Sequence, residues 1–148
     1  MRIALAADHA GYQLKDELAQ WLRDAGHEIS DLGTNAPDSV DYPEFGMRLA
    51  NTVASGQAER GVVVCGSGIG ISIAVNRNPA CRCARVSEPL SAALAREHND
   101  ANVLALGARL VGSDMAKACV EAFLGTDFAG GRHQRRVDQL SQLLQESD

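Results

Sequence analysis

An apolar run that ends in a cysteine and passes directly into a glycine-rich loop limits what this chain can fold into. The run is Gly61–Cys65, and the loop Gly66–Gly70 has three glycines in five positions. A wholly apolar strand of this kind is typical of the interior of a parallel sheet. A thiol at its carboxyl end lies beside loop N–H groups that favour a thiolate and can hold an oxyanion or a phosphate. A buried structural cysteine before a tight turn is the alternative, but the three glycines favour a functional site.

Strand-like and helix-like segments alternate along the rest of the chain. The expected strands are Arg2–Ala7, His27–Asp31, Arg60–Val64, Arg82–Val86 and Asn102–Leu106. The expected helices are Gly11–Ala25, Pro43–Ala54, the stretch from the glycine loop to Asn76, Pro89–His98, Ser113–Leu124 and His133–Gln145. Strict alternation of strands and helices predicts a parallel sheet with helices on both faces.

The sequence therefore predicts one α/β domain over residues 1–148, a doubly wound fold with five parallel strands in the order 2-1-3-4-5. Ligands of such folds bind outside the carboxyl ends of the strands, where the strand order reverses. Strands one and three are neighbours at that point, and their ends carry Asp8–Gly11 and Cys65–Gly68. The most reactive residue types thus fall where the fold predicts a site.

Composition argues against several classes of protein. Hydrophobic residues make up 45% and charged residues 22%, as in ordinary globular domains. No apolar run is long enough to span a membrane and the N-terminus does not suit a signal peptide, so we expect a cytoplasmic protein without a membrane partner. A net charge of −5 argues against binding to nucleic acid. The four cysteines have neither disulfide nor zinc spacing, which indicates a reducing compartment and no metal site.

Further polar residues are expected at the same edge of the sheet. His98–Asp100 precedes the fifth strand, and Arg109 follows it. The chain also has one basic segment, Gly130–Arg136, in which Arg132 and Arg136 are four residues apart and so share a helix face. Two cations at a helix N-terminus oppose the helix dipole, which favours a small anionic ligand bound between them.

Six short segments carry a family resemblance when they are taken together and in order. They are Asp8–Gly11, Asp41–Pro43, Cys65–Ser72, Ser87–Pro89, His98–Leu104 and Gly130–His133. This set closely resembles the ribose-5-phosphate isomerase B family, to which the galactose-6-phosphate and allose-6-phosphate isomerases also belong. The resemblance covers nearly the whole chain. It implies a Rossmann-like sheet, a homodimer or a tetramer with the active site at the subunit interface, and isomerisation of a sugar phosphate with neither metal nor cofactor.

The resemblance also implies which residues are catalytic. Cys65 matches the base that moves a proton between C1 and C2 of the open-chain sugar through a cis-enediolate. Ser67 would help to shuttle the proton, and His98 matches the acid/base that opens the furanose ring. Some relatives use a glutamate in place of the thiol, but Ile69–Ser72 contains no acid, so the cysteine is the expected base.

Other residues match the family's substrate-binding positions. Asp8 would orient a sugar hydroxyl, and Tyr42 would pack beside the sugar or only support the loop. The groups that match the anion hole for the enediolate are the backbone N–H groups of Gly66, Ser67, Gly68, Ile69 and Gly70 and the side chain of Asn99. The residues that match the phosphate clamp are His9, Arg109, Arg132 and Arg136.

Several other functions fit the sequence less well. A cysteine phosphatase needs an arginine six residues after its cysteine, where this chain has Ile71. The glycine spacing differs from the dinucleotide-binding motif and follows the third strand rather than the first. Ribose 5-phosphate is the default substrate, and a tetrose phosphate, allose 6-phosphate and galactose 6-phosphate are alternatives. A non-catalytic sugar-phosphate-binding subunit is a further alternative, against which the presence of both Cys65 and His98 argues.

Overall fold

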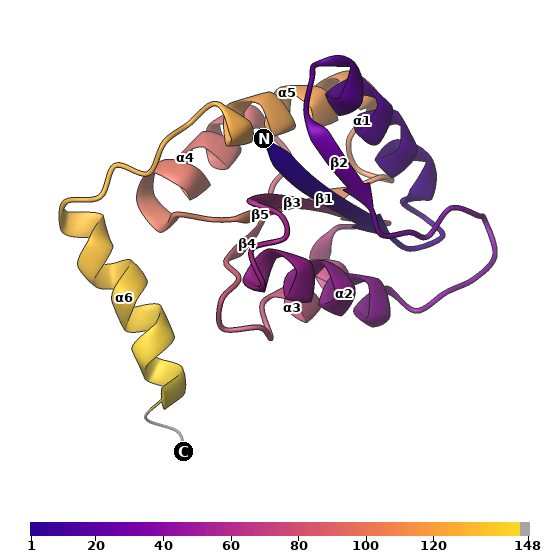
Figure 1. Ribbon diagram of the computed structural model, residues 1–148. Helices are drawn as coiled ribbons and strands as arrows, with labels where there is room; N and C mark the ends of the chain where they lie inside the picture. The colour runs from indigo at the N-terminus through magenta and orange to yellow at the C-terminus, as the bar shows by residue number, and fades with distance from the viewer. Residues whose placement is uncertain (146–148) are drawn as a thin grey trace.

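The computed structural model describes residues 1–145, which alternate between strands and helices as expected (Figure 1). The strands in this part of the chain are β1 (Arg2–Ala7), β2 (Glu28–Asp31), β3 (Arg60–Cys65), β4 (Cys83–Arg85) and β5 (Val103–Gly107). The helices are α1 (Tyr12–Asp24), α2 (Tyr42–Ala54), α3 (Ile69–Val75), α4 (Pro89–Asn99), α5 (Ser113–Leu124) and α6 (Arg132–Gln145). Every strand pair is parallel, which confirms the predicted α/β class.

The order of the strands is β2-β1-β3-β5-β4, so the predicted order of the last two strands is wrong. The two strands differ in composition and burial. All five residues of β5 are buried, whereas β4 has three residues and is partly exposed. A wholly apolar strand is stabilised by neighbours on both sides, while a short strand flanked by arginines suits the edge of a sheet. For this reason β5 pairs with β3, and β4 is the edge strand.

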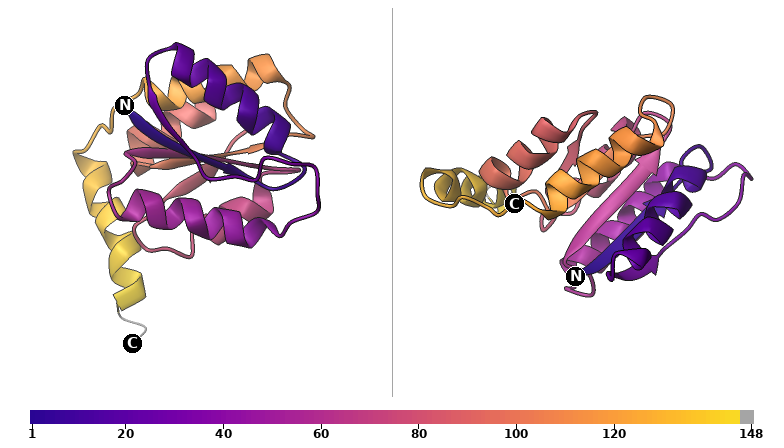
Figure 2. Two further views of the ribbon diagram at one scale, coloured as in Figure 1. Left: turned by 45° about the vertical axis from the view of Figure 1, so that its right-hand side comes forward. Right: turned by 90° about the horizontal axis from the view of Figure 1, so that it is seen from above.

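Helices cover both faces of the sheet (Figure 2). Side chains alternate along β3: Val62 and Val64 pack with α1, α4 and α5, whereas Val63 and Cys65 pack with α2 and α3. Cys65 is therefore at the carboxyl end of a central strand, on the face that α2 and α3 cover. None of the helices within residues 1–145 is both long and apolar enough to cross a bilayer.

Helix α6 lies outside these layers and extends away from the sheet beside the end of α4 (Figures 1 and 2). Gly130 and Gly131 precede it, with φ angles of +64° and +53° that favour glycine. Val137 is buried, whereas Arg132 and Arg136 are exposed. The start of α6 thus presents Arg132 and Arg136 to solvent.

Candidate active site

Three neighbouring strands end at one edge of the sheet, and the residues that follow them line a pocket of about 310 Å³. Asp8 follows β1, Cys65 ends β3 and Arg109 follows β5. Seven of the eight lining residues are predicted site residues: Asp8, Tyr42, Cys65, Gly66, Ser67, Gly70 and Arg109. The eighth is Leu110. The structure thus brings together the residues that were expected from the ends of the first and third strands.

The Cys65 thiol lies at the base of the glycine loop and is only 4% exposed. The backbone N–H of Gly68 donates a hydrogen bond to Cys65 Sγ at 3.1 Å. Gly68 has a φ of +77°, and a Cβ atom there would lie 2.8 Å from the carbonyl carbon of Leu106. Glycine is therefore required for the loop to aim this N–H at the sulfur. An N–H donor on the sulfur stabilises a thiolate, the form that can accept a proton.

Ser67 and Ile69 belong to the same loop and are held by local hydrogen bonds. The N–H of Ile69 donates to Ser67 Oγ at 3.1 Å, and Arg85 Nε donates to the carbonyl oxygen of Ser67 at 3.0 Å. Arg85 was not among the predicted residues. Because the first-turn N–H groups of a helix have no intrahelical acceptor, the start of α3 leaves such donors next to the pocket.

Asp8 and His9 follow β1 and are each fixed by backbone N–H groups. Oδ1 of the buried Asp8 accepts hydrogen bonds from the N–H groups of Ala10 at 2.9 Å and Gly11 at 3.1 Å. Nδ1 of His9 accepts a hydrogen bond from the Val40 N–H at 3.2 Å. Since Nδ1 acts as an acceptor, a neutral His9 carries its proton on Nε2 and can donate a hydrogen bond from that atom.

The side chains of Arg109 and Tyr42 each lie against one end of the glycine loop. A Cβ atom on Gly66 would lie 3.1 Å from the Arg109 guanidinium, and one on Gly70 would lie 2.7 Å from the Tyr42 ring. The small size of these two glycines therefore lets a cation and an aromatic ring approach the loop closely. Arg109 provides positive charge at the pocket, which suits a phosphate.

His98 and Asn99 are at the other end of the sheet, contrary to the expectation that they share an edge with Cys65. They form the C-terminal end of α4, next to the connections that lead into β4 and β5. A helix that links two parallel strands runs back across the sheet, so its last residues lie near the amino ends of the strands. The two ends of β3 are about 16 Å apart at ~3.3 Å per residue. Within one chain, therefore, His98 does not reach the Cys65 pocket.

The arginines of α6 lie near His98 rather than near Cys65. The connection to α6 is attached to α4 by the Ala129 N–H, which donates to the carbonyl oxygen of Glu97 at 3.0 Å. Beyond it, the His133 ring stacks on the His98 ring. His133 was seen in the sequence only as part of the basic segment, and spacing alone gave no reason to pair it with His98. No acidic side chain in the described part of the chain forms an ion pair with Arg132 or Arg136.

The other three cysteines have a packing role. Cys81 and Cys119 are buried, Cys83 is partly buried, and none of the three lines the Cys65 pocket. Burial raises the pKa of the Cys81, Cys83 and Cys119 thiols. These thiols therefore stay protonated at neutral pH, which suits a role in packing.

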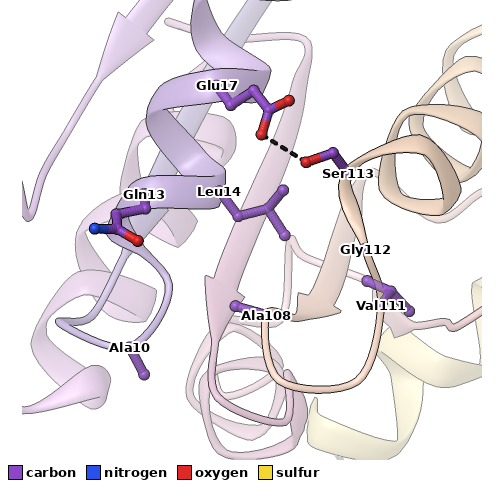
Figure 3. A pocket seen from close by; sticks show the side chains of 8 residues that line it. All are labelled: Ala10, Gln13, Leu14, Glu17, Ala108, Val111, Gly112 and Ser113. Carbon is purple, nitrogen blue, oxygen red and sulfur yellow. Dashed lines mark hydrogen bonds between the residues drawn. The ribbon is translucent and has the colours of Figure 1, made fainter.

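A second hollow, of about 300 Å³, lies between α1 and the start of α5 (Figure 3). Ser113 Oγ donates a hydrogen bond to Glu17 Oε2 across it at 2.7 Å. Hydrogen bonds from Ser113 and Lys117 lower the pKa of Glu17, so its carboxylate is ionised at neutral pH. Within the described residues its lining contains this acid and no arginine or lysine. The hollow therefore suits a phosphate less well than the Cys65 pocket.

Comparison with known proteins gives a consistent picture. The family model described as Ribose/Galactose Isomerase matches residues 3–140. Ribose-5-phosphate isomerase B of Escherichia coli is 44% identical over 97% of this chain and 97% of its own length. The solved structure of ribose-5-phosphate isomerase B from Clostridium thermocellum has a TM-score of 0.98 at 46% identity and covers both chains completely. The enzyme from Mycoplasma genitalium, solved with bound ribulose-5-phosphate, has a TM-score of 0.94 at 36% identity over 98% of this chain and 97% of that one.

Proposed function

Because this chain belongs to the ribose/galactose isomerase family, it is a sugar phosphate isomerase, and we propose that it interconverts D-ribose 5-phosphate and D-ribulose 5-phosphate. The observation that carries the proposal is the hydrogen bond from the Gly68 N–H to Cys65 Sγ in a pocket that also holds Arg109. A proton acceptor, backbone donors and a cation for phosphate are the groups that isomerisation of a sugar phosphate requires.

The proton transfer would run through a cis-enediolate. The Cys65 thiolate takes the proton from C2 of the open-chain aldose and returns it to C1, while the hydroxyl proton on O2 passes to O1 with the help of Ser67. Negative charge develops on the substrate oxygens as the proton leaves carbon. The backbone N–H groups of Gly66, Ser67 and Gly70 and the Asn99 side chain stabilise that charge, because the N–H groups of Gly68 and Ile69 already donate to Cys65 Sγ and Ser67 Oγ.

Ring opening and binding would use the remaining residues. The His98 imidazole exchanges protons with the ring oxygen and the anomeric hydroxyl, because the cyclic sugar has no free aldehyde. Asp8 accepts a hydrogen bond from a sugar hydroxyl, and Tyr42 packs beside the sugar. The phosphate is bound by the side chains of His9, Arg109, Arg132 and Arg136.

Such a site requires two copies of the chain, as in a homodimer. Cys65 and His98 lie toward opposite ends of the strands in one chain, so they can act on one sugar only if they come from different chains. The exposed arginines at the start of α6 support this arrangement, since α6 extends from the body of the molecule (Figure 2). Each protomer would supply Cys65 to one site and the residues of α4 and α6 to the other.

Two experiments test the proposal. In the first, turnover of aldose phosphates with four, five and six carbons is compared by kcat/KM. The proposal expects the highest value for ribose 5-phosphate. A higher value for a shorter or longer aldose phosphate would reassign the substrate. No turnover of any of them would favour a non-catalytic binding subunit.

In the second experiment, Cys65→Ala and Arg132→Ala chains are mixed and allowed to exchange subunits. A mixed dimer has one site with both residues intact, so a statistical mixture should recover about a quarter of the wild-type activity at low substrate concentration. Absence of recovery in mixtures shown to exchange subunits would contradict the two-chain site.

A further inference from the structure

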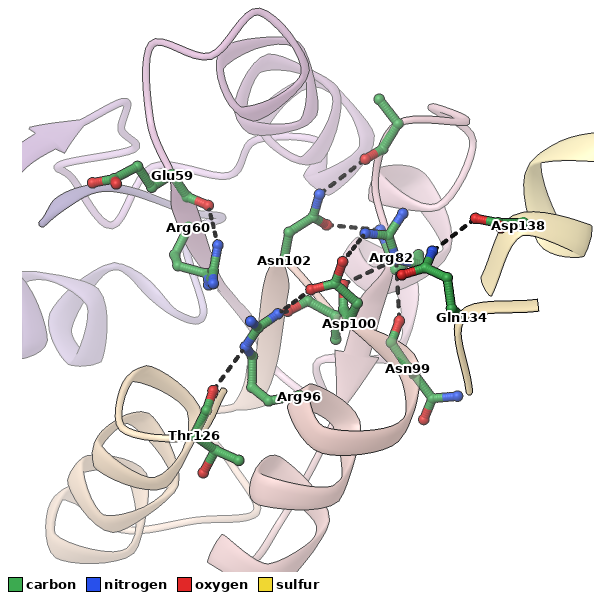
Figure 4. A network of polar contacts seen from close by, with 12 residues as sticks. Glu59, Arg60, Arg82, Arg96, Asn99, Asp100, Asn102, Thr126, Gln134 and Asp138 are labelled. Carbon is green, nitrogen blue, oxygen red and sulfur yellow. Dashed lines mark hydrogen bonds and ion pairs between the residues drawn. The ribbon is translucent and has the colours of Figure 1, made fainter. Parts of the chain in front are cut away.

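Two arginines meet the carboxylate of Asp100 at the end of α4 (Figure 4). Arg96 donates from NH1 to Asp100 Oδ1 at 2.9 Å, and Arg82 donates from NH2 to Asp100 Oδ2 at 3.3 Å. We call Arg82, Arg96 and Asp100 the Asp100 cluster. It lies directly beside His98 and Asn99, which complete the last turn of α4.

Arg82 also holds the backbone of this last turn. Its Nε donates to the carbonyl oxygen of Asn99 at 3.1 Å and to that of Asp100 at 2.9 Å. The last carbonyl groups of a helix have no intrahelical donor, and a guanidinium with several N–H groups in one plane suits them. Arg82 precedes β4, so a different element of the fold fixes the end of α4.

Arg96 extends the cluster toward α6. It is 3% exposed and donates from NH1 to the Ala101 carbonyl at 2.7 Å and from Nε to the Thr126 carbonyl at 3.2 Å. Thr126 belongs to the connection that leads to α6. One buried guanidinium therefore joins the end of α4 to the segment that precedes Arg132.

The cluster is a costly way to end a helix. Asp100 has a φ of +47°, in the left-handed region where glycine is the usual residue at a helix C-terminus. Burial and the positive charge of Arg96 lower the pKa of the neighbouring Arg60, although the Asp100 and Glu59 carboxylates act in the opposite direction. A glycine would end α4 without strain or crowded charge, but it would not provide the carboxylate that holds Arg82 against the Asn99 carbonyl.

We propose that Arg82 is a positioning residue for the reaction, which sets the direction of the His98 imidazole by fixing the last turn of α4. The inference rests on the proposed role of His98 in ring opening. It adds a residue that does not touch the sugar and whose effect on ring opening is exerted through His98. Loss of Arg82 should therefore impair the opening of cyclic substrates more than proton transfer on substrates that cannot cyclise.

The test compares ribose 5-phosphate, which cyclises, with erythrose 4-phosphate, which cannot close a furanose through its phosphorylated position. The readout is the ratio of kcat/KM for the two substrates. Arg82→Gln should lower this ratio about tenfold, with KM for ribose 5-phosphate changed less than about threefold because the phosphate-binding side chains are untouched. Arg82→Lys should recover only part of the loss, since one ammonium cannot bridge two carbonyls and a carboxylate.

Arg48→Gln is the matched control, because Arg48 also donates to a backbone carbonyl, that of Leu32, but lies far from α4. It should leave the ratio unchanged. The Arg82 side chain is 24% exposed, so Arg82→Gln does not create a buried void, and denaturant unfolding of each variant checks that it folds.

The double variant Arg82→Gln/His98→Asn shows whether Arg82 acts through His98 or affects the reaction independently of it. With the imidazole absent, Arg82→Gln should lower the ratio no further than His98→Asn alone. A further fall in the double variant, or an unchanged ratio in Arg82→Gln with lower stability, would overturn the inference while leaving the proposed function intact. An unchanged ratio in His98→Asn would instead remove His98 from ring opening, and the inference would fall with it.

Discussion

The imidazole rings of His98 and His133 are stacked, with their centroids 4.5 Å apart and their planes inclined by 16°. One ring belongs to the last turn of α4 and the other to the first turn of α6. The contact joins His98, which is proposed for ring opening, to α6, which is proposed for phosphate binding. It also places two titratable groups within reach of each other's charge.

This contact predicts a pH dependence of stability. Partial burial, and then the charges of His98, Arg132 and Arg136, lower the pKa of His133 below its ordinary value of 6.5. The unfolded chain therefore binds this proton at a higher pH than the folded chain. Neutral His133 therefore contributes to the free energy of unfolding, and this stabilisation is fully present above pH 6.5. It is lost as the pH falls through the folded-state pKa of His133.

Denaturant unfolding between about pH 7 and about pH 5 measures this contribution. His133→Phe keeps a ring that can stack but cannot titrate. We expect the unfolding free energy of His133→Phe to decrease less on acidification than that of the wild-type protein. The same decrease in both proteins would show that His133 has no part in the pH dependence.

Cys65→Ala should abolish isomerisation with little loss of stability. Removal of a general base typically costs a factor of roughly 10²–10⁴ in rate. Cys81→Ala is the matched control, because Cys81 is also buried but lies outside the pocket, and it should retain wild-type kcat. Steady-state kinetics of both variants decide the point. If kcat of Cys65→Ala stays within about tenfold of the wild-type value, the base is another residue.

Arg132→Ala and Arg136→Ala should each raise KM for the sugar phosphate by a factor of roughly 10 or more, as expected for a lost charge-assisted hydrogen bond. The apo variants should be as stable as the wild-type protein or slightly more so, because both cations oppose the dipole of α6. Arg135→Ala is the control, since it makes the same change of charge on the same helix. An equal rise in KM for Arg135→Ala would show that the loss of positive charge, and not a specific contact of Arg132 or Arg136, causes the effect.

Gly68→Ala should reduce both stability and turnover. A side chain at a φ of +77° costs about 1–2 kcal/mol, and the close contact with the Leu106 backbone adds to that cost. Gly26→Ala is the control, because Gly26 has a φ of +94° with nothing within 4 Å of an added Cβ atom. Both variants should lose stability, Gly68→Ala more than Gly26→Ala, and kcat should fall only in Gly68→Ala. Unchanged turnover in Gly68→Ala would remove its N–H from the mechanism.

The fold could be predicted from local patterns, because the central strands are short apolar runs and the helices have amphipathic spacing. Strand order depends instead on which strand is better buried. The sequence did contain a signal for it: Val103–Gly107 is wholly apolar, whereas arginines flank the short Cys83–Arg85. Chain order alone suggested the wrong neighbour for β3.

The candidate site was predictable where its residues follow strands. Asp8, Cys65 and Arg109 lie at or just after the carboxyl ends of three neighbouring parallel strands, so topology brings them to one edge. His98 and Asn99 end the helix that leads into β5, and that position places them at the opposite edge. The stack of His133 on His98 depends on the path of residues 125–131, which no periodic pattern describes.

The two glycines before α6 have a consequence for how this protein can evolve. Between the Ala129 N–H bond to Glu97 and the His133 stack, the path of the chain passes through Gly130 and Gly131, and nothing lies within 4 Å of a Cβ atom added to either. A side chain at either position would redirect Arg132, His133 and Arg136 together without disturbing the sheet or the Cys65 loop. Under the two-chain site proposed above, a single codon change there would alter how α6 reaches the partner subunit's pocket and its phosphate, while the Cys65 loop of each chain stayed the same. Under that proposal, the helix that binds the phosphate and the loop that moves the proton can change independently of each other.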